Sequence, residues 1–284
     1  PNEAKTINKT FYSFSTKIKF KPDTIITKEL VLQKYSKKLY KLDLIKNSTI
    51  TDDEIKQLKN MHELHLKYNN KITDEGIKHL TNIRKLNLYS NDTITDNALK
   101  HLTNIQHLNL CINYTITNEG IKHLINIYEL DLPFNKIITD EGIKHLINIE
   151  SLNLTCNKII TDEGIKHLIN IHELHLTFNN TITDKGIKHL TNIKKLDLSD
   201  NNTITDEGLK HLTNIRKLNL FSNDTITDNV FKHLTNIQQL YLSANNKIAT
   251  FFRETAKFLP ISMREKIFTS VFFGNVSVKR HCHV

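Results

Sequence analysis

Hydrophobic residues recur along this chain in a single pattern that repeats every 22 residues. The pattern is easiest to follow in a pair of leucines separated by one residue, and it continues without insertion through ten copies. The first leucine of each pair is Leu42, Leu64, Leu86, Leu108, Leu130, Leu152, Leu174, Leu196, Leu218 or Leu240. A period of roughly 20 to 50 residues with one small structural unit per period predicts a solenoid, in which each copy stacks on its neighbours.

Each copy contains a predicted strand and a predicted helical turn. In the copy that spans residues 138–159, Leu152 and Leu154 alternate with other residues, which predicts a short strand whose leucines point inward. Ile143, Leu146 and Ile149 lie three residues apart, which fits one or two turns of α- or 3₁₀-helix. One copy cannot bury these side chains alone, so the copies must stack.

Two further residues recur at fixed places in the pattern, and we expect both to lie where neighbouring copies are in contact. An asparagine follows every predicted strand, at Asn47, Asn69, Asn91, Asn113, Asn135, Asn157, Asn179, Asn201, Asn223 and Asn245. We expect these side chains to form a ladder that bonds backbone groups where each strand turns away. We also expect Gly142 to let its turn approach the neighbouring copy closely, although Ala98 and Val230 fill that place elsewhere.

The phrase L-x-L-x-x-N-x-x-I-T-D-x-G-I-K-H-L, which covers about residues 40–250, resembles a leucine-rich repeat. Its I-T-D-E-G-I part is most similar to repeats of leucine-rich F-box proteins, although those often carry Cys in place of the Asn and are a few residues longer. The resemblance implies an α/β solenoid with a parallel β-sheet on the concave face and short helical turns on the convex face. It also implies a module that binds protein targets.

The repeats divide the chain into three parts. Residues 40–248 are the array, and residues 1–39 are an N-terminal cap in which Ile18-Lys19-Phe20 is expected to add an edge strand. Residues 249–284 are expected to form a helical cap of two short helices, separated by Pro260, and a tail.

The N-terminal cap carries a second resemblance. Asn8, Lys9, Phe11 and Tyr12 resemble the phrase that closes an F-box, which implies that an F-box is truncated before Pro1 and would bind a Skp-type adaptor. The alternative is an ordinary amphipathic cap.

Composition indicates which partners and which cellular compartment to expect. The net charge of +9 favours acidic partners only mildly, because Lys and Glu alternate within the repeats. Three cysteines, Cys111, Cys156 and Cys282, fit a reducing compartment, so we expect an intracellular, cytoplasmic protein, in the host cell if it comes from a pathogen or virus. No apolar run is long enough to cross a membrane, so no membrane partner is expected.

Recurring polar columns are poor candidates for chemistry, because a catalytic site needs different groups that converge on one point. A histidine column runs through the predicted turns, at His79, His101, His123, His145, His167, His189, His211 and His233. We expect it and the adjacent lysines to be solvated, and acidic residues beside the lysines make nucleic-acid binding an unfavoured alternative. His281-Cys282-His283 is too short for a metal site. The sequence predicts no enzyme, no cofactor and no metal.

Positions that depart from the repeat surround the strands, on the face expected to be concave. We predict that they bind a partner, since aromatic residues among mixed charges are typical of interface hot spots. The candidates are Tyr68, Tyr89, Ile112, Glu129, Asp131, Phe134, His175, Phe178 and Phe221. The alternative is drift of solvent-exposed positions after repeat duplication.

The predicted function is non-catalytic protein binding. The F-box resemblance implies the substrate-recognition part of a ubiquitin-ligase adaptor, with the target held on the concave face. The alternative is a stand-alone scaffold or effector that has no link to a ligase.

Overall fold

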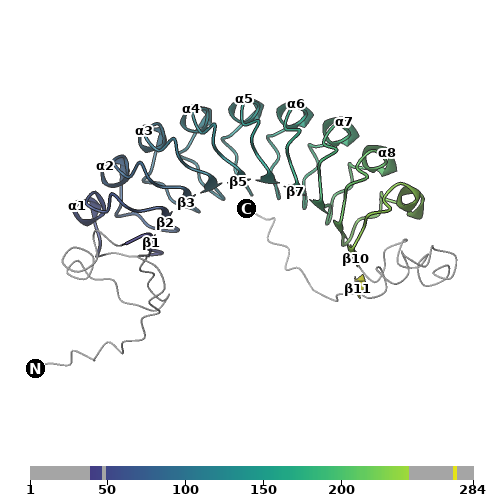
Figure 1. Ribbon diagram of the computed structural model, residues 1–284, viewed down its shortest axis with the longest axis horizontal. Helices are drawn as coiled ribbons and strands as arrows, with labels where there is room; N and C mark the ends of the chain where they lie inside the picture. Colours follow the sequence, from purple (N-terminus) through teal and green to yellow (C-terminus); the bar gives the residue numbers. More distant parts are fainter. Residues whose placement is uncertain (1–38, 47–48, 243–270, 274–284) are drawn as a thin grey trace, which may run out of the picture.

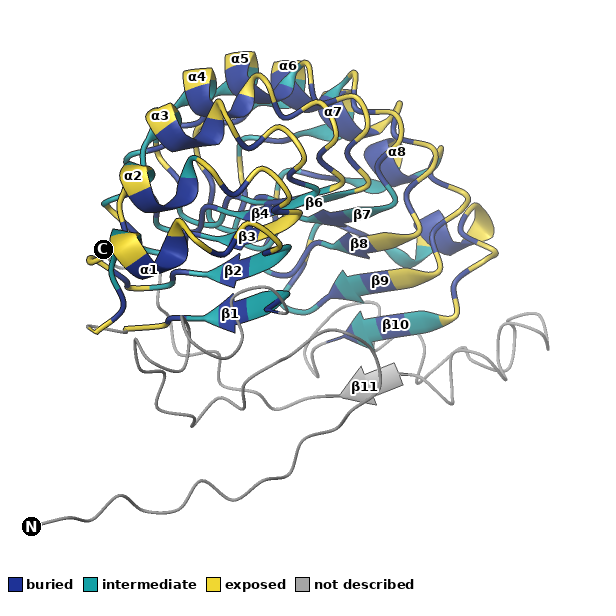
Figure 2. Cartoon of the chain, turned by 60° about the vertical axis from the view of Figure 1, so that its left-hand side comes forward, coloured by how far each residue is buried: buried dark blue, intermediate teal, exposed yellow. Residues whose placement is uncertain are grey.

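The computed structural model describes residues 39–46 and 49–242, and the backbone of residues 271–273. These residues form a crescent with strands along its inner side and helical turns along its outer side (Figure 1). The faces that the strands and turns present to each other are buried, while the outer surfaces of the turns are exposed (Figure 2). The predicted solenoid of strand-and-turn units is confirmed.

The strands form one parallel sheet in chain order. Neighbouring strands pair without a shift in register, so that Leu42 lies opposite Leu64 and Leu64 opposite Leu86. The strands are β1 (Lys41–Asp43), β2 (Glu63–His65), β3 (Lys85–Asn87), β4 (His107–Asn109), β5 (Glu129–Asp131), β6 (Ser151–Asn153), β7 (Glu173–His175), β8 (Lys195–Asp197), β9 (Lys217–Leu220), β10 (Gln239–Leu242) and β11 (Val271–Phe273).

The helical turns are short and start alike. A threonine precedes each one in an extended conformation, and in α6 the Thr161 Oγ1 accepts a hydrogen bond from the Glu163 N–H at 3.2 Å. The turns are α1 (Asp52–Ile55), α2 (Asp74–Ile77), α3 (Asp96–Leu99), α4 (Asn118–Ile121), α5 (Asp140–Ile143), α6 (Asp162–Ile165), α7 (Asp184–Ile187), α8 (Asp206–Leu209) and the 3₁₀ turn η2 (Asp228–Lys232).

The core fills the space between the sheet and the turns. In the repeat centred on α5, Ile138, Ile143, Ile149, Leu152 and Leu154 are all 0% exposed. Each side chain packs beside its counterparts one repeat away in a single continuous cluster. Burial of such an aliphatic side chain stabilises the fold by about 1.5 to 3 kcal/mol, so stacking is the main source of stability.

The predicted asparagine ladder is confirmed from Asn69 to Asn223, whereas Asn47 and Asn245 lie outside the described residues. The Nδ2 of Asn91 donates to the carbonyl oxygen of Asn69 at 2.6 Å, and its Oδ1 accepts from the Ile94 N–H at 3.0 Å. The residue before each ladder asparagine has a positive φ, such as 54° at Tyr68. This left-handed residue turns the chain out of the strand and aims the asparagine side chain inward.

Two more ladders, which were not predicted from the sequence, join the repeats. The Asp162 carboxylate accepts from the Thr183 N–H at 2.8 Å and from its hydroxyl at 2.6 Å. On one flank, the Asn148 Nδ2 donates to the carbonyl oxygen of Ile125 at 2.9 Å. Both contacts recur in neighbouring repeats, so each repeat is tied to the previous one at three separate places.

The expected close approach at the glycine column is confirmed. A Cβ placed on Gly164 would be in hard contact with Oδ1 of Asp140, which is the ladder aspartate of the preceding turn. Val230 occupies this place in η2, and that turn is a 3₁₀ helix rather than an α-helix.

The prediction of helix in the C-terminal cap is wrong at residues 271–273. These residues form β11, which pairs in parallel with β10 and places Val271 opposite Leu240. The exposed edge of β10 offers unpaired backbone groups, and Val-Phe-Phe has high strand propensity. The rest of the C-terminal cap and the proposed N-terminal edge strand lie outside the described residues.

Candidate protein-binding surface

The candidate surface has two parts, a concave face and a rim. The concave face consists of the first and third side chains of strands β1 to β10, which point away from the core. Most of them are half-buried, because the side chains of adjacent strands cover one another. The rim consists of the two residues that follow the second leucine of the leucine pair in each repeat.

A charged cluster lies at the β1–β2 end of the concave face. Lys41 forms an ion pair with Glu63, and the His65 Nε2 lies 3.0 Å from Glu63 Oε1. Burial alone would raise the pKa of Glu63, but its contacts with Lys41 and His65 hold that pKa below its usual value. The charges in this cluster are already paired within the molecule.

The centre of the concave face is acidic. Asp131 accepts a hydrogen bond from the Asn109 Nδ2 at 2.9 Å, and the Glu129 carboxylate lies 2.6 Å from the His107 Nδ1. Burial and the nearby Glu129 charge raise the pKa of Asp131. These residues and Lys85 line a hollow of about 170 Å³. A positively charged group placed there would lower the cost of keeping Asp131 ionised.

A second hollow lies toward the β10 end of the concave face. It has a volume of about 280 Å³, and its lining includes His175, Lys217 and Tyr241. Glu173 contacts Lys195 at 2.7 Å and His175 at 3.0 Å. Burial would raise the pKa of Glu173, but these two contacts lower it overall. This end is therefore a mixture of paired charges and one aromatic ring.

The rim carries the aromatic candidates. Tyr68 is 41% exposed, but Tyr89, Phe134, Phe178 and Phe221 are half-buried. Neighbouring residues therefore cover part of each of the latter four rings. The left-handed backbone at Phe134 and Phe178 directs these side chains along the rim, where adjacent repeats cover part of each ring.

One aromatic cluster is closely packed. The rings of Tyr68 and Tyr89 meet edge to face at 5.2 Å, and the Lys67 Nζ lies 4.0 Å from the centroid of Tyr89. A hydrogen bond with Tyr68, burial and the neighbouring Cys111 raise the pKa of Tyr89 to about 12. Lys67 is not among the candidates predicted from the sequence, although its departure from neighbouring repeats at that place could have indicated it.

The candidate residues form a band and not a single pocket. Glu129, Asp131 and Phe134 share the β5 repeat, and His175 and Phe178 share the β7 repeat two positions away. Ile112 lies on the rim of the β4 repeat and is half-buried. Tyr68 and Tyr89 occupy one end of the band, and Phe221 occupies the other. The arrangement suits an extended contact with a large partner better than capture of a small molecule.

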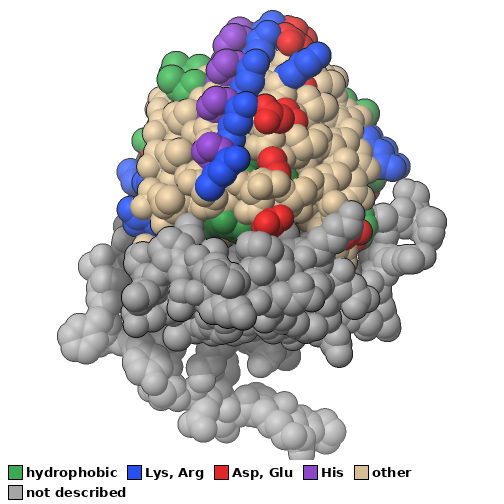
Figure 3. Space-filling model, turned by 90° about the vertical axis from the view of Figure 1, so that its right-hand side faces the viewer, with side chains coloured by type: hydrophobic (Ala, Val, Ile, Leu, Met, Phe, Trp, Pro, Cys, Tyr) green, Lys and Arg blue, Asp and Glu red, His purple; other side chains and the backbone are tan. Residues whose placement is uncertain are grey.

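The convex surface offers little chemistry. Figure 3 shows Asp and Glu, Lys and His as adjacent stripes across it. Several stripe lysines are paired within their own turn; Lys78 contacts Glu75 at 2.6 Å and lowers the pKa of Glu75. Such pairing reduces the positive charge available to a nucleic-acid backbone. Among the residues that the structure describes, no group of three or more His, Cys, Asp or Glu could hold a metal ion. The tail motif His281-Cys282-His283 lies outside them.

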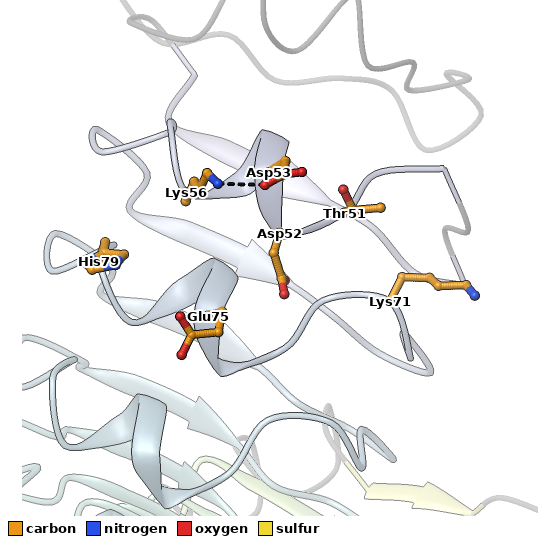
Figure 4. Close-up of a pocket in the computed structure, with 7 residues that line it drawn as sticks. All are labelled: Thr51, Asp52, Asp53, Lys56, Lys71, Glu75 and His79. Atoms are coloured by element: carbon orange, nitrogen blue, oxygen red, sulfur yellow. Dashed lines mark hydrogen bonds and ion pairs between the residues drawn. The ribbon is translucent and has the colours of Figure 1, made fainter.

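A hollow of about 540 Å³ lies beside α1 and α2 (Figure 4). Its lining contains Asp52, Asp53, Lys56, Glu75 and His79. The Asp52 carboxylate already accepts two hydrogen bonds from the Thr73 ladder residue, and Asp53 contacts Lys56 at 2.6 Å. The Asp52 carboxylate is therefore occupied by a contact between repeats and Asp53 by a contact within its own turn, so these charges do not converge on a ligand.

Comparison with known proteins agrees with this architecture. The leucine-rich repeat family model matches residues 57–80, 123–146, 145–168, 167–190, 189–212 and 211–229. None of the curated proteins matches the sequence at a significant level. The fold and these matches show a leucine-rich repeat solenoid, an architecture typical of modules that bind proteins.

Three solved structures illustrate the similarity. An internalin, inlF, from Listeria monocytogenes is 20% identical, with a TM-score of 0.52, over 78% of this chain and 79% of that chain. A chain of the mouse RP105/MD-1 complex is 18% identical, with a TM-score of 0.57, over 81% of this chain and 46% of that chain. A chain of the yeast Rad7 and Elc1 complex is 17% identical, with a TM-score of 0.42, over 76% and 78%. At these identities the likeness concerns the fold alone.

The lengths and hydrophobicity of the helices bear on whether any of them could span a membrane. None of the helices in the described part of the chain has the length and apolar character needed to span a membrane.

Proposed function

We propose that the concave face and its rim bind a protein partner. The observation that supports this most is the contrast between the ladders and the strand faces. Three ladders and the core hold the repeats in nearly the same conformation, while the outward side chains of the strands differ from one repeat to the next. A rigid support with a variable inner surface is the arrangement that solenoids use for extended binding surfaces.

The charges suggest the chemistry of the partner. Glu129, Asp131 and Glu173 lie on the central strands, and the raised pKa of Asp131 reflects burial and like charge. A lysine or arginine of the partner would relieve that repulsion, and apolar groups would cover the half-buried rings of Phe134 and Phe178. This combination of a buried charge contact with aromatic anchors is typical of interface hot spots.

The test is capture of binding proteins by the full chain and by a double variant, Phe134→Ala with Phe178→Ala. We expect the variant to lose its partner while its free energy of unfolding changes by about 1 kcal/mol or less for each half-buried ring. A variant of the convex surface, His145→Ala with His167→Ala, is the matched control and should bind normally. Equal binding by all three proteins would contradict the proposal, and unfolding of the double variant would place these rings in the core.

The proposed role in a ubiquitin ligase depends on the resemblance at Asn8, Lys9, Phe11 and Tyr12, which lie outside the described residues. In this proposal the array holds a target, and an upstream F-box recruits the ligase through a Skp-type adaptor. Co-purification of such an adaptor with the full-length protein would support it, while a target captured without an adaptor would favour a stand-alone scaffold. Cys111 forms no disulfide among the described residues, which supports the cytoplasm as the proposed location.

A further inference from the structure

Three consecutive repeats carry an exposed isoleucine where most other repeats carry threonine. Ile125, Ile147 and Ile169 are 60%, 56% and 55% exposed. Their column continues with threonine on both sides, at Thr81, Thr103, Thr191, Thr213 and Thr235. Tyr128, which follows Ile125 by three residues, is 41% exposed. The three isoleucines make an apolar stripe in the middle of an otherwise polar column, and Tyr128 belongs to the next column.

The stripe lies on one flank of the crescent. Ile125 lies between α4 on the convex side and β5 on the concave side, so its side chain belongs to neither surface. The flank is one of the two broad sides of the crescent seen in Figure 1. In Figure 3 hydrophobic side chains lie beyond the histidine stripe, on the side away from the lysines. The stripe is therefore separate from the proposed partner surface.

Backbone contacts fix the spacing of the stripe. The Asn148, Asn170 and Asn192 side chains donate to the carbonyl oxygens of Ile125, Ile147 and Ile169, each at 2.9 Å. A second column runs beside it, where the N–H groups of Glu150, His172 and Lys194 donate to the carbonyl oxygens of Tyr128, Glu150 and His172, each at 2.8 Å. The apolar column and this charged column therefore run side by side, each with one residue per repeat.

We propose that this flank binds the same flank of a second copy of the chain, in a two-fold symmetric dimer. A two-fold axis that points radially, from the concave to the convex side, superimposes two arcs of equal curvature and runs their repeats in opposite directions. Each residue column of one copy then faces the same column of the other copy, as a self-complementary interface requires. The concave faces of both copies remain open on the same side.

The two columns select one register for this dimer. When the axis passes between the repeats of Ile147 and Ile169, each of these isoleucines faces the other in the second copy. In the charged column Glu150 then faces His172, and Tyr128 faces Lys194, which are favourable pairs. Further along the same column Gln106 faces Arg216, so no like charges meet.

The alternative register centred on Ile147 is less favourable. It places Glu150 opposite its own copy and Arg84 opposite Arg216. Like charges in direct contact at an interface disfavour it, so charge complementarity supports the register that passes between Ile147 and Ile169.

The first experiment is sedimentation equilibrium of the full chain and of a double variant, Ile147→Thr with Ile169→Thr. Threonine occurs naturally in this column, so the variant should keep its circular dichroism spectrum and melting temperature. We expect the wild type to dimerise and the variant to dimerise about tenfold or more weakly. Ile159→Thr, which changes a 36% exposed isoleucine on the opposite flank, should leave dimerisation unchanged.

A matched pair of substitutions tests the register. In this dimer Thr191 faces Ile125 of the second copy, whereas Thr103 faces Thr213. Thr191→Ile should therefore strengthen dimerisation about fivefold or more, and Thr103→Ile should have little effect. A wild-type chain that remains monomeric up to about 100 µM, or a dimer that Ile147→Thr with Ile169→Thr leaves unchanged, would overturn the proposal. A stronger dimer with Thr103→Ile than with Thr191→Ile would overturn the register.

Discussion

The Nδ2 of Asn135 lies 2.9 Å from the carbonyl oxygen of Asn113, which is the ladder asparagine one repeat earlier. The Oδ1 of the same side chain accepts a hydrogen bond from the Ile138 N–H at 2.8 Å. Asn135 is 1% exposed, so water cannot replace these contacts. Each ladder asparagine thus satisfies buried backbone groups of its own repeat and of its neighbour, and gives the array its fixed stacking.

Asn135→Ala should destabilise the array by about 2 to 4 kcal/mol, because it leaves a buried carbonyl oxygen and a buried N–H without partners. Asn148→Ala is the comparison, since that side chain is exposed and water can replace its contact with the Ile125 carbonyl oxygen. We expect a cost of about 1 kcal/mol or less for the second variant. Urea denaturation followed by circular dichroism measures both, and equal costs would contradict the role given to the buried ladder.

The aspartate ladder offers a comparison that the chain itself provides. Asp162→Ala removes the acceptor for both the Thr183 N–H and its hydroxyl, and should cost about 1 to 3 kcal/mol. Asp162→Asn should cost less, because Asn118 occupies the same place naturally and still accepts from the Thr139 N–H at 3.0 Å. Thermal and urea unfolding would check the order. An asparagine variant as unstable as the alanine variant would show that the negative charge is essential.

The ionisation of Asp131 should lower the stability of the protein as pH rises, whereas most surface carboxylates have the opposite effect. Its pKa in the folded protein is raised above the ordinary 3.8, so the folded state binds the proton more tightly than the unfolded state. The free-energy penalty of holding Asp131 ionised in the folded protein is absent below the pKa of the unfolded state. It appears as pH rises through the pKa of the folded state. Asp131→Asn should therefore stabilise the protein at about pH 7, by under about 1 kcal/mol, and have no such effect at about pH 3.

The measurement for Asp131→Asn is urea unfolding of wild type and variant at both pH values. A variant that is destabilised at neutral pH would show that the hydrogen bond from Asn109 outweighs burial and the repulsion by Glu129. The proposed function adds a second expectation, that the same variant binds the partner more weakly. A gain in stability combined with a loss of binding is typical of residues placed for function.

Glu173 should behave in the opposite way. Lys195 and His175 lower the pKa of Glu173 despite its burial. Its contribution to stability is therefore present above the pKa of the unfolded state and is lost as pH falls through the pKa of the folded state. Lys195→Met should reduce stability modestly near neutral pH, by under about 1 kcal/mol, and much less at about pH 3. Lys188→Met changes an exposed lysine of the convex surface and serves as the control. A loss that is the same at both pH values would exclude the ion pair as its cause.

The sequence predicted the repeating parts of the fold well, because each buried column leaves a visible period. Leu152, Leu154 and Asn157 lie in the predicted places, and the turn around Gly142 contacts its neighbour as expected. The contact between Asp162 and Thr183 was not predicted, although both columns are regular. Its recognition requires knowing that residues 21 positions apart meet in space, which the period alone does not state.

The candidate surface was predicted less completely. Departures from the repeat correctly identified the outward strand residues such as Asp131, but not the extent to which Phe134 and Phe178 are covered. That burial depends on the left-handed backbone at each ring and on the shape of the adjacent repeats, and neither follows from a pattern of residue types. The strand at Val271–Phe273 was missed for a similar reason, since only the open edge of β10 explains it.

The most direct test of the central claim is hydroxyl-radical footprinting of the full chain with and without its captured partner. We predict that the partner protects Tyr68, Phe134 and Phe178 from oxidation, while His145 and His167 on the convex surface remain as reactive as in the free protein. Protection of the histidines with no change at Tyr68, Phe134 and Phe178 would contradict a binding site on the concave face and its rim.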